Sequence, residues 1–145
     1  MKIEEIYHEW DSDNTIDVTN IANESANIPK LHNKYFKIYM EEGMKLRKLK
    51  AEYKQFIKLK GEYYRGELDD GELKENGWEP QRLKILKQDL PIHVDADQQV
   101  IDMSLRVGIQ DEKVSYLESI IKMINNRGFQ IKSIIDWAKF TQGQM

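Results

Sequence analysis

The sequence predicts an all-α protein, and three features of its 145 residues indicate this class. Only three prolines and eight glycines interrupt the chain, so long helices have room to form. Apolar residues recur at spacings of three and four from Leu31 to about Tyr64, which is typical of one long amphipathic helix. The same spacing returns in the C-terminal third. A hydrophobic fraction of 40% and a charged fraction of 32% fit a folded helical protein.

The segments before the long helix are shorter. Residues 2–10 have the pattern of an amphipathic helix, and the turn-forming stretch DSDNTID is expected to end it. Thr19 is placed to cap a second helix over residues 20–28, because a threonine oxygen can accept amide hydrogens of a first turn. Pro29 lacks an amide hydrogen, so it either ends this helix or kinks it, and the sequence leaves both open.

The middle of the chain carries turn signals. The stretch GELDDGELKENG, residues 66–77, is predicted as an acidic loop. Residues 78–87 are predicted as a helix that tolerates Pro80 in its first turn. For residues 89–100, DLPIHVDADQQV, the sequence does not decide between a loop and a short strand.

The C-terminal third is predicted as two helices. Asp111 could cap a helix that runs to Asn126, and Gly128 is expected to end it in the left-handed conformation. A last helix is expected over about 130–140. Its apolar surface exceeds what one neighbouring helix would cover, which predicts self-association. The apolar residues expected in this interface are Leu117, Ile120, Ile121, Ile124, Phe129, Ile131, Ile134, Ile135 and Trp137.

Several kinds of chemistry find no support in the sequence. Without cysteine the chain forms neither a disulfide nor a thiolate zinc site. It contains no phosphate-binding glycine loop, so we expect no ATP hydrolysis, and it contains neither the HExxH nor the G-x-S-x-G motif. His93, Asp95 and Asp97 are the best metal-like cluster, but a solvated loop explains them better, and we predict no metal or cofactor. No apolar run approaches the ~20 residues of a membrane span, and the first residues do not resemble a signal peptide, so we expect a cytoplasmic protein with no membrane contact.

Charge is distributed unevenly along the chain. Residues 1–29 hold seven acidic residues against one lysine, and residues 66–105 hold ten against four bases. Between them, residues 30–65 hold eleven bases against four acids, a local balance of +7 in a chain of net charge −3. Because binding responds to the local field of a patch, the acidic total does not exclude an anionic partner.

Five bases of the long helix fall within one narrow angular sector, nearly opposite the apolar stripe. They are Arg47, Lys50, Lys54, Lys58 and Arg65. A solvated helix normally mixes acids into such a face for pairing with bases one turn away. A line of cations instead suits a phosphate backbone, which is bound with release of counterions.

Lys60 falls inside the apolar sector, between Phe56 and Tyr64. Its stem could reach solvent from a boundary position, or a ligand could cover this end of the helix. Tyr63 and Tyr64 could then stack on bases of single-stranded nucleic acid. Aromatic residues at helical spacing are more often core residues, however, so residue types alone favour a solvated face with buried aromatics, and we favour packing for both tyrosines.

Three ordered blocks of sequence resemble one known family. They are IDVTNIANESAN with LHNKYFK, then LRKLKAEYKQFIKLKGEYYRG, and finally IIKMINNRGFQIKSIIDWAKFTQG. Together they resemble the UvsY-type recombination mediators of T-even-like phages over nearly the whole chain. The likeness is weakest from about 66 to 100.

The resemblance implies a non-enzymatic function in DNA recombination and repair. Family members bind single-stranded DNA, form ring-shaped homo-oligomers, and help a RecA-like phage recombinase replace the phage single-stranded-DNA-binding protein. The family's binding motif maps onto Lys58, Lys60, Tyr63 and Tyr64. The family has arginine at the position of Lys60, and lysine keeps the charge but loses the bidentate fork.

The combined expectation is a helical protomer with a long central basic amphipathic helix and C-terminal helices that assemble a ring of six or seven subunits. Residues 1–100 would form the single-stranded-DNA-binding domain and residues 101–145 the oligomerisation helices. The protein would act in the cytoplasm of an infected bacterial host. Two alternatives remain: a helical scaffold whose basic face binds an acidic protein, and a helix-turn-helix duplex reader, which no basic short helix near the C-terminus supports.

Overall fold

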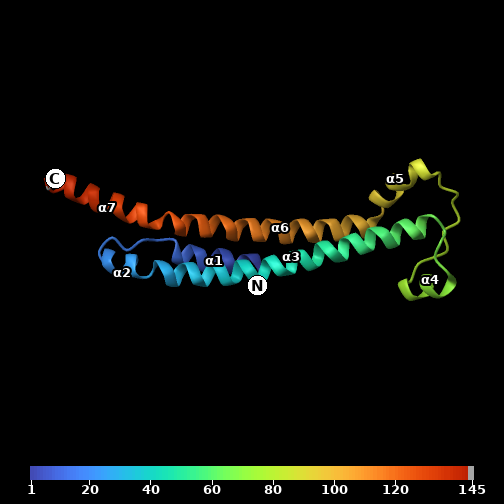
Figure 1. Ribbon diagram of the computed structural model, residues 1–145, viewed down its shortest axis with the longest axis horizontal. Coiled ribbons are helices and arrows are strands. Elements are labelled where there is room, and N and C mark those ends of the chain that lie inside the picture. The colour runs from blue at the N-terminus through green and yellow to red at the C-terminus, as the bar shows by residue number, and fades with distance from the viewer. Residues whose placement is uncertain (144–145) are drawn as a thin grey trace. The chain divides into compact units, whose positions relative to one another are not determined.

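The computed structural model describes residues 1–143 and confirms the all-α prediction. In this part of the chain every regular element is helical (Figure 1). The elements are α1 (Ile3–Asp13), α2 (Ile21–Ala26), α3 (Ile28–Tyr64), α4 (Asp70–Asn76), the short 3-10 helix η1 (Lys87–Asp89), α5 (Leu90–Asp95), α6 (Gln98–Asn125) and α7 (Arg127–Thr141).

The long basic helix is confirmed as α3, which begins three residues before the predicted start. Pro29 is its second residue, and α2 ends at Ala26, so of the two alternatives left open at Pro29 the preceding helix ends rather than kinks. A proline is tolerated there because the first amide hydrogens of a helix have no partner within the helix. The predicted cap at Thr19 is wrong, since Asn20 precedes α2 and the Thr19 hydroxyl instead donates to Asp17 at 2.6 Å.

The predictions for residues 66–100 are largely wrong. The expected acidic loop contains α4, because the Asp69 carboxylate accepts a hydrogen bond from the amide of Glu72 at 2.8 Å and caps the helix. Gly77, at a φ of 71°, ends α4 in the left-handed conformation. The segment left open between loop and strand instead contains η1 and α5.

Residues 78–86 form no helix, although one was predicted. The amide of Trp78 bonds back to the carbonyl of Leu73 at 2.9 Å. The Gln81 side chain donates to the carbonyls of Tyr64 and Leu83 and accepts from the amide of Leu83. These bonds hold the backbone in an irregular path that local propensity alone would not select.

The C-terminal helix boundaries also differ from the prediction. α6 begins at Gln98 rather than after Asp111, because the Asp97 carboxylate accepts from the amides of Gln99 and Val100 at 2.9 and 3.1 Å. Gly128 does not end a helix. It lies in the first turn of α7 and does not have a positive φ.

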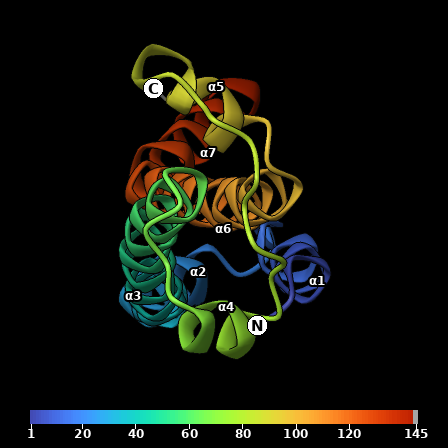
Figure 2. The same ribbon diagram turned by 90° about the vertical axis from the view of Figure 1, so that its right-hand side faces the viewer.

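The chain divides into two compact units. The first combines Met1–Met44 with the chain from Glu112 onward, and the second is Lys45–Asp111. α1, α3 and α6 meet in the core of the first unit, and Figure 2 looks along these helices. That core consists of Ile6, Tyr35, Leu117, Ile120 and Ile124. These geometric units do not test the functional division predicted at residue 100.

The first unit is tied together by ion pairs as well as by its core. The Arg127 guanidinium of α7 is buried, lies 3.0 Å from Glu24 of α2, and also donates to the carbonyl of Thr15. The second unit buries Leu46, Leu73, Val94 and Val100 together with the charged residue Lys60. Among the described residues no helix is long and apolar enough to cross a membrane.

Candidate nucleic-acid interface

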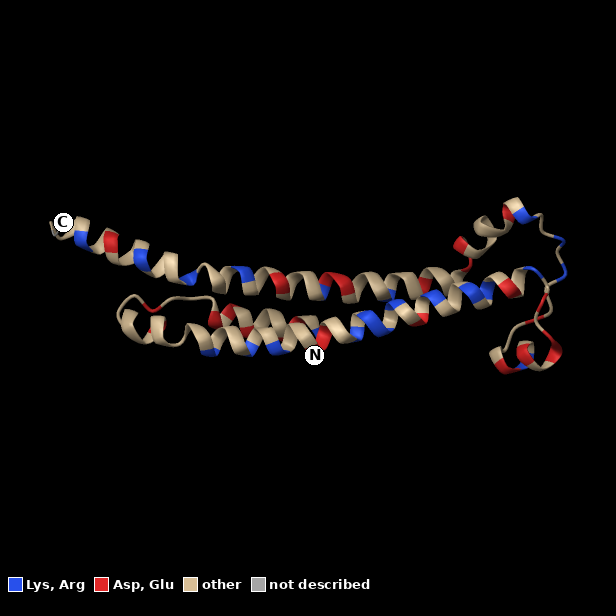
Figure 3. Ribbon diagram, viewed as in Figure 1, with Lys and Arg blue, Asp and Glu red and all other residues tan. Residues whose placement is uncertain are grey.

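The predicted line of cations is exposed along the part of α3 that lies in the second unit (Figure 3). We call it the ridge, and it comprises Arg47, Lys50, Lys54, Lys58 and Arg65. The first four make no ion pair with any residue in the described range 1–143. Arg65 Nε lies 2.9 Å from an oxygen of Glu67, and both side chains are about half exposed. Four of the five cations are therefore free to meet an external anion.

The basic region that precedes the ridge is partly neutralised. Lys34 Nζ lies 2.6 Å from carboxylate oxygens of both Glu9 and Asp13. Burial alone would lower the pKa of Lys34, but these two hydrogen-bonded carboxylates outweigh it and raise that pKa. Part of the acidic N-terminal segment thus pairs with α3 inside the first unit, whereas four of the five ridge cations have no carboxylate partner in the described part of the chain.

Lys60 differs from the ridge because its side chain is buried, with the residue 3% exposed. Its ammonium lies 3.0 Å from the Asp97 carboxylate. It also lies 4.0 Å from the ring centre of Trp78, and at longer range faces the rings of Tyr63 and Phe56. A carboxylate and a ring face both stabilise a cation removed from water. We call Lys60, Trp78 and Asp97 the Lys60 cluster.

Asp97 connects several elements to this cluster. It accepts the hydroxyl of Tyr64 at 2.6 Å and caps α6 through two backbone amides. Burial by itself raises the pKa of Asp97, but the hydrogen bond from Tyr64 and the charge of Lys60 outweigh it, so this pKa lies below its ordinary value. Burial, followed by the bond to Asp97, raises the pKa of Tyr64. The carboxylate is therefore ionised and fully engaged at neutral pH.

The two tyrosines of the motif have protein partners for their hydroxyl groups. Tyr63 donates to the carbonyl of Glu79 at 2.7 Å, and its ring packs 5.2 Å from that of Trp78. The rings of Tyr63 and Tyr64 lie 5.1 Å apart, edge to face, and both residues are half-buried. This packing fits the preferred interpretation of the sequence, while a contact of either ring with DNA stays a prediction.

The weak metal candidate does not assemble as a ligand set. Asp97 is engaged with Lys60, the His93 ring packs beside Tyr64 at 5.9 Å, and Asp95 is exposed on α5. Within residues 1–143, no group of three histidine, aspartate or glutamate side chains is arranged to hold a metal ion.

The residues predicted for self-association separate into three groups. Leu117, Ile120, Ile124 and Ile131 are buried within the protomer. Ile121 and Ile134 are half-buried. Phe129, Ile135 and Trp137 are exposed, the first and last by 72% and 66%, and the exposed Phe140 stacks on Trp137 at 5.8 Å. Only the exposed group could meet another subunit without disturbing the core.

The structure also brings together bases that the sequence analysis missed. Arg82, Lys84 and Lys87 join Arg65 around a pocket of about 610 Å³, whose one acidic lining residue is Glu67. Summing the charges of residues 66–105 hid them within an acidic average. The predicted helix over 78–87 also concealed that the irregular segment carries Arg82 and Lys84 and that Lys87 is the first residue of η1. The signal that was available is the local run RLKILK, three bases without an acid.

Comparisons with known proteins agree with this architecture. A family model described as "Recombination, repair and ssDNA binding protein UvsY" matches residues 9–144. The recombination protein uvsY of Enterobacteria phage T4 is 27% identical over 145 residues, which cover 99% of this chain and 100% of that protein.

Solved structures show the same fold. A crystal structure of the bacteriophage T4 recombination mediator protein UvsY, in lattice type IV, superposes with a TM-score of 0.83 at 23% identity and covers 97% of this chain and 99% of that chain. The lattice type II structure gives 0.81 at 24% identity, with 98% of each chain covered. The match of the family model over most of the sequence shows that the chain belongs to the UvsY family of recombination, repair and single-stranded-DNA-binding proteins, which is a non-enzymatic family.

Proposed function

We propose that the chain binds single-stranded DNA through the ridge and promotes loading of a RecA-like phage recombinase in place of the phage single-stranded-DNA-binding protein. The observation that carries this proposal is the row of exposed cations at Arg47, Lys50, Lys54 and Lys58 without ion-pair partners among residues 1–143. Cations that already have a carboxylate partner gain little from a phosphate. Unpaired cations gain the full release of counterions from the strand.

No bond is made or broken in the proposed mechanism. Each protomer contributes one ridge of modest affinity, and several ridges on one homo-oligomer engage the same strand. Once one ridge is bound, the next binds at a high effective concentration, so the assembly holds the strand much more tightly than a single protomer. A strand held in this way binds the phage single-stranded-DNA-binding protein less tightly and becomes accessible to the recombinase.

A ring of six or seven subunits would provide these ridges. Support comes from α7, whose exposed residues Phe129, Trp137 and Phe140 form more apolar surface than a soluble protomer usually leaves uncovered. Sedimentation equilibrium should give six or seven times the protomer mass of 17.2 kDa.

The decisive experiment measures fluorescence anisotropy of a labelled oligothymidine as salt is raised. The variant Lys50→Ala/Lys54→Ala/Lys58→Ala should bind more weakly and lower the slope of log affinity against log salt by about 2, because each lost phosphate contact removes about 0.7. A matched variant, Lys30→Ala/Lys37→Ala/Lys132→Ala, removes three exposed lysines of the first unit and should keep the wild-type slope.

Two outcomes would contradict the proposal. If wild-type protein gave no anisotropy change at submicromolar concentration, the ridge would instead suit an acidic protein partner. If the two triple variants lost slope equally, binding would depend on total charge rather than on the ridge.

Recombinase loading can be followed through the lag in recombinase ATPase activity on DNA covered by the single-stranded-DNA-binding protein. Wild-type chain should shorten the lag, and the ridge variant should shorten it much less. A ridge variant as effective as the wild type would separate loading from this DNA contact.

A further inference from the structure

We infer that the pocket beside the C-terminal end of α3 is a second part of the DNA interface, in which residues 81–87, the end of the irregular segment and the first residue of η1, bind the strand after it leaves the ridge. This inference rests on the proposed function. The pocket lies within the second unit and has a volume of about 610 Å³. That volume is within the range of roughly 300–1,000 Å³ found for sites that enclose small organic groups.

The net positive charge of the pocket lining suits the anionic backbone of a nucleotide chain. The lining contains four cations, Arg65, Arg82, Lys84 and Lys87, and one carboxylate, that of Glu67, which is already 2.9 Å from Arg65. All four cations are exposed. Arg82, Lys84 and Lys87 make no ion pair within residues 1–143, so their charge is available to phosphates.

The lining also contains apolar surface placed between these cations. Leu83 is 68% exposed, and Ile85 and Leu90 are half-buried at the same pocket. A single exposed leucine is common on protein surfaces, but here it lies at a pocket that also contains two half-buried aliphatic residues and four cations. Deoxyribose and the faces of bases are apolar, whereas phosphates are anionic, so single-stranded DNA matches both parts of the lining.

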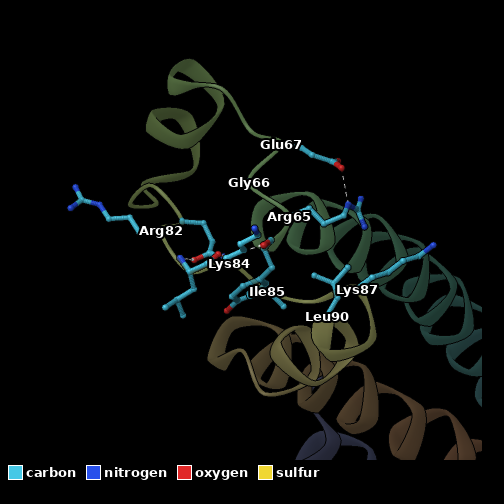
Figure 4. A pocket seen from close by; sticks show the side chains of 11 residues that line it. Arg65, Gly66, Glu67, Arg82, Lys84, Ile85, Lys87 and Leu90 are labelled. Atoms are coloured by element: carbon cyan, nitrogen blue, oxygen red, sulfur yellow. Dashed lines mark hydrogen bonds and ion pairs between the residues drawn. The ribbon is translucent and has the colours of Figure 1, made fainter.

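The cations are spread out rather than gathered around one point (Figure 4). Arg82 and Lys87 extend away from the pocket in different directions, and Arg65 and Lys84 approach it from the residue that follows α3 and from the irregular segment. Cations that converge hold a single anion. Cations arranged in succession suit consecutive phosphates of one strand, which favours DNA over a free nucleotide.

The irregular segment is held in place by bonds to α3. The Tyr63 hydroxyl binds the carbonyl of Glu79, and the Gln81 amide binds the carbonyl of Tyr64 at 3.0 Å. The cations of the segment are therefore positioned before DNA arrives, which reduces the entropy lost on binding. Arg65 belongs to both the ridge and the pocket, so the two surfaces are continuous.

The test uses the full-length chain and the variant Arg82→Ala/Lys84→Ala/Lys87→Ala. In the oligothymidine assay its slope of log affinity against log salt should fall by about 2. The control is again Lys30→Ala/Lys37→Ala/Lys132→Ala, with no expected change. Urea unfolding should show wild-type stability, because the three side chains replaced in the pocket are exposed. A wild-type slope in the pocket variant, with the ridge variant still impaired, overturns this inference and leaves the proposed function intact.

A second measurement locates the strand directly. Because the chain has no cysteine, Leu83→Cys can carry a single maleimide-linked benzophenone. Ultraviolet light should crosslink it to oligothymidine, whereas the same probe on Met123→Cys, an exposed site in the first unit, should not react. Equal crosslinking at both sites overturns the inference. Loss of the crosslink with millimolar thymidine monophosphate, while the strand stays bound, also overturns it and assigns the pocket to a free nucleotide.

Discussion

Lys58 and Lys60 lie two residues apart on α3, yet the structure gives them opposite surroundings. Lys58 is exposed on the ridge, without an ion pair in the described chain, whereas Lys60 is buried between a carboxylate and an aromatic ring. Two residues correspond to a rotation of about 200° around a helix, which moves a side chain from the solvent face to the packed face. Position around the helix, rather than residue type or motif membership, separates a cation that can bind from one that supports the fold.

The Lys60 cluster joins three parts of the second unit. Lys60 comes from α3, Trp78 from the start of the irregular segment, and Asp97 from the N-terminal end of α6. The family motif assigns both Lys58 and Lys60 to DNA binding, but the different surroundings of the two lysines indicate two different roles. Lys58 contacts the strand under the proposed function, and Lys60 positions the elements that carry the other contacts.

The largest effect that distinguishes the two lysines is on stability. Lys60→Ala leaves the buried Asp97 carboxylate without its cation and removes the contact with Trp78. We expect the free energy of unfolding to fall by about 3 kcal/mol, the lower end of the range for a buried ion pair, because Asp97 keeps its bonds from Tyr64 and from α6. Urea unfolding followed by circular dichroism, at one fixed protein concentration, measures this change.

Lys58→Ala is the matched control, since it removes the same side chain from an exposed position. Its free energy of unfolding should stay within about 0.5 kcal/mol of wild type, and its salt slope for oligothymidine should fall by about 0.7. Adding Lys60→Ala should lower the slope no further. A fall of about 1.4 in the double variant would place Lys60 on the DNA instead.

Sequence periodicity predicted α3 and the ridge correctly because both depend on local geometry. A helix that turns by a constant angle converts spacing directly into direction, so bases at 47, 50, 54, 58 and 65 must share a side. The odd position of Lys60 was also visible in this way. The buried partner that explains it, Asp97, lies 37 positions later in the chain, and local spacing carries no information about such a pairing.

The missed elements are those that depend on tertiary contacts. The first half of α6 exposes Ile101, Leu105 and Ile109, which are spaced by four and share one face, and it buries Val100 on another face. Apolar residues on two faces do not give the single amphipathic stripe by which a helix is usually recognised, although the spacing of four was itself a helical signal. The irregular path of residues 78–86 is held by the Tyr63 side chain and by the backbone carbonyl of Tyr64, both at the end of α3. The bases around the pocket become neighbours of Arg65 only through that path.

A smaller effect, on the pH dependence of stability, tests whether the Lys60 cluster depends on an ionised carboxylate. The pKa of Asp97 is depressed in the folded state relative to its ordinary value of about 3.9. The stabilisation that the ionised Asp97 gives to the folded state is therefore complete above the ordinary pKa of the carboxyl group. It is lost as the pH falls through the lower pKa that Asp97 has in the folded protein. Asp97→Asn should be less stable than wild type at pH 7, and this deficit should shrink as the wild-type carboxylate becomes protonated.

Urea unfolding of both proteins between pH 7 and pH 2.5 measures this difference. Asp13→Asn is a useful comparison because the pKa of Asp13 is also lowered, by Lys34 and Tyr35 against the effect of burial, but in the first unit. The two effects should add, since the sites share no partner. A constant difference between wild type and Asp97→Asn at all pH values would show that the carboxylate charge does not contribute.

The smallest effect concerns Tyr63. The family motif assigns this residue to DNA, and in the structure it lies at the end of α3, where the ridge meets the segment that leads to the pocket. Its hydroxyl donates to the carbonyl of Glu79 at 2.7 Å and so holds the segment that leads to the pocket. Tyr63→Phe keeps the ring and removes this bond, so the free energy of unfolding should fall by about 1 kcal/mol. Tyr53→Phe, which removes a hydroxyl that has no hydrogen-bond partner within residues 1–143, should change the free energy of unfolding by less than about 0.5 kcal/mol.

DNA binding by the same variants tests whether Tyr63 contacts the strand. If Tyr63 only supports the segment, the oligothymidine affinity of Tyr63→Phe should fall slightly, because Arg82 and Lys84 are then held less firmly. Affinity in Tyr63→Leu should then fall no further, whereas a base stacked on the ring would cost this second variant about 1–3 kcal/mol of binding free energy.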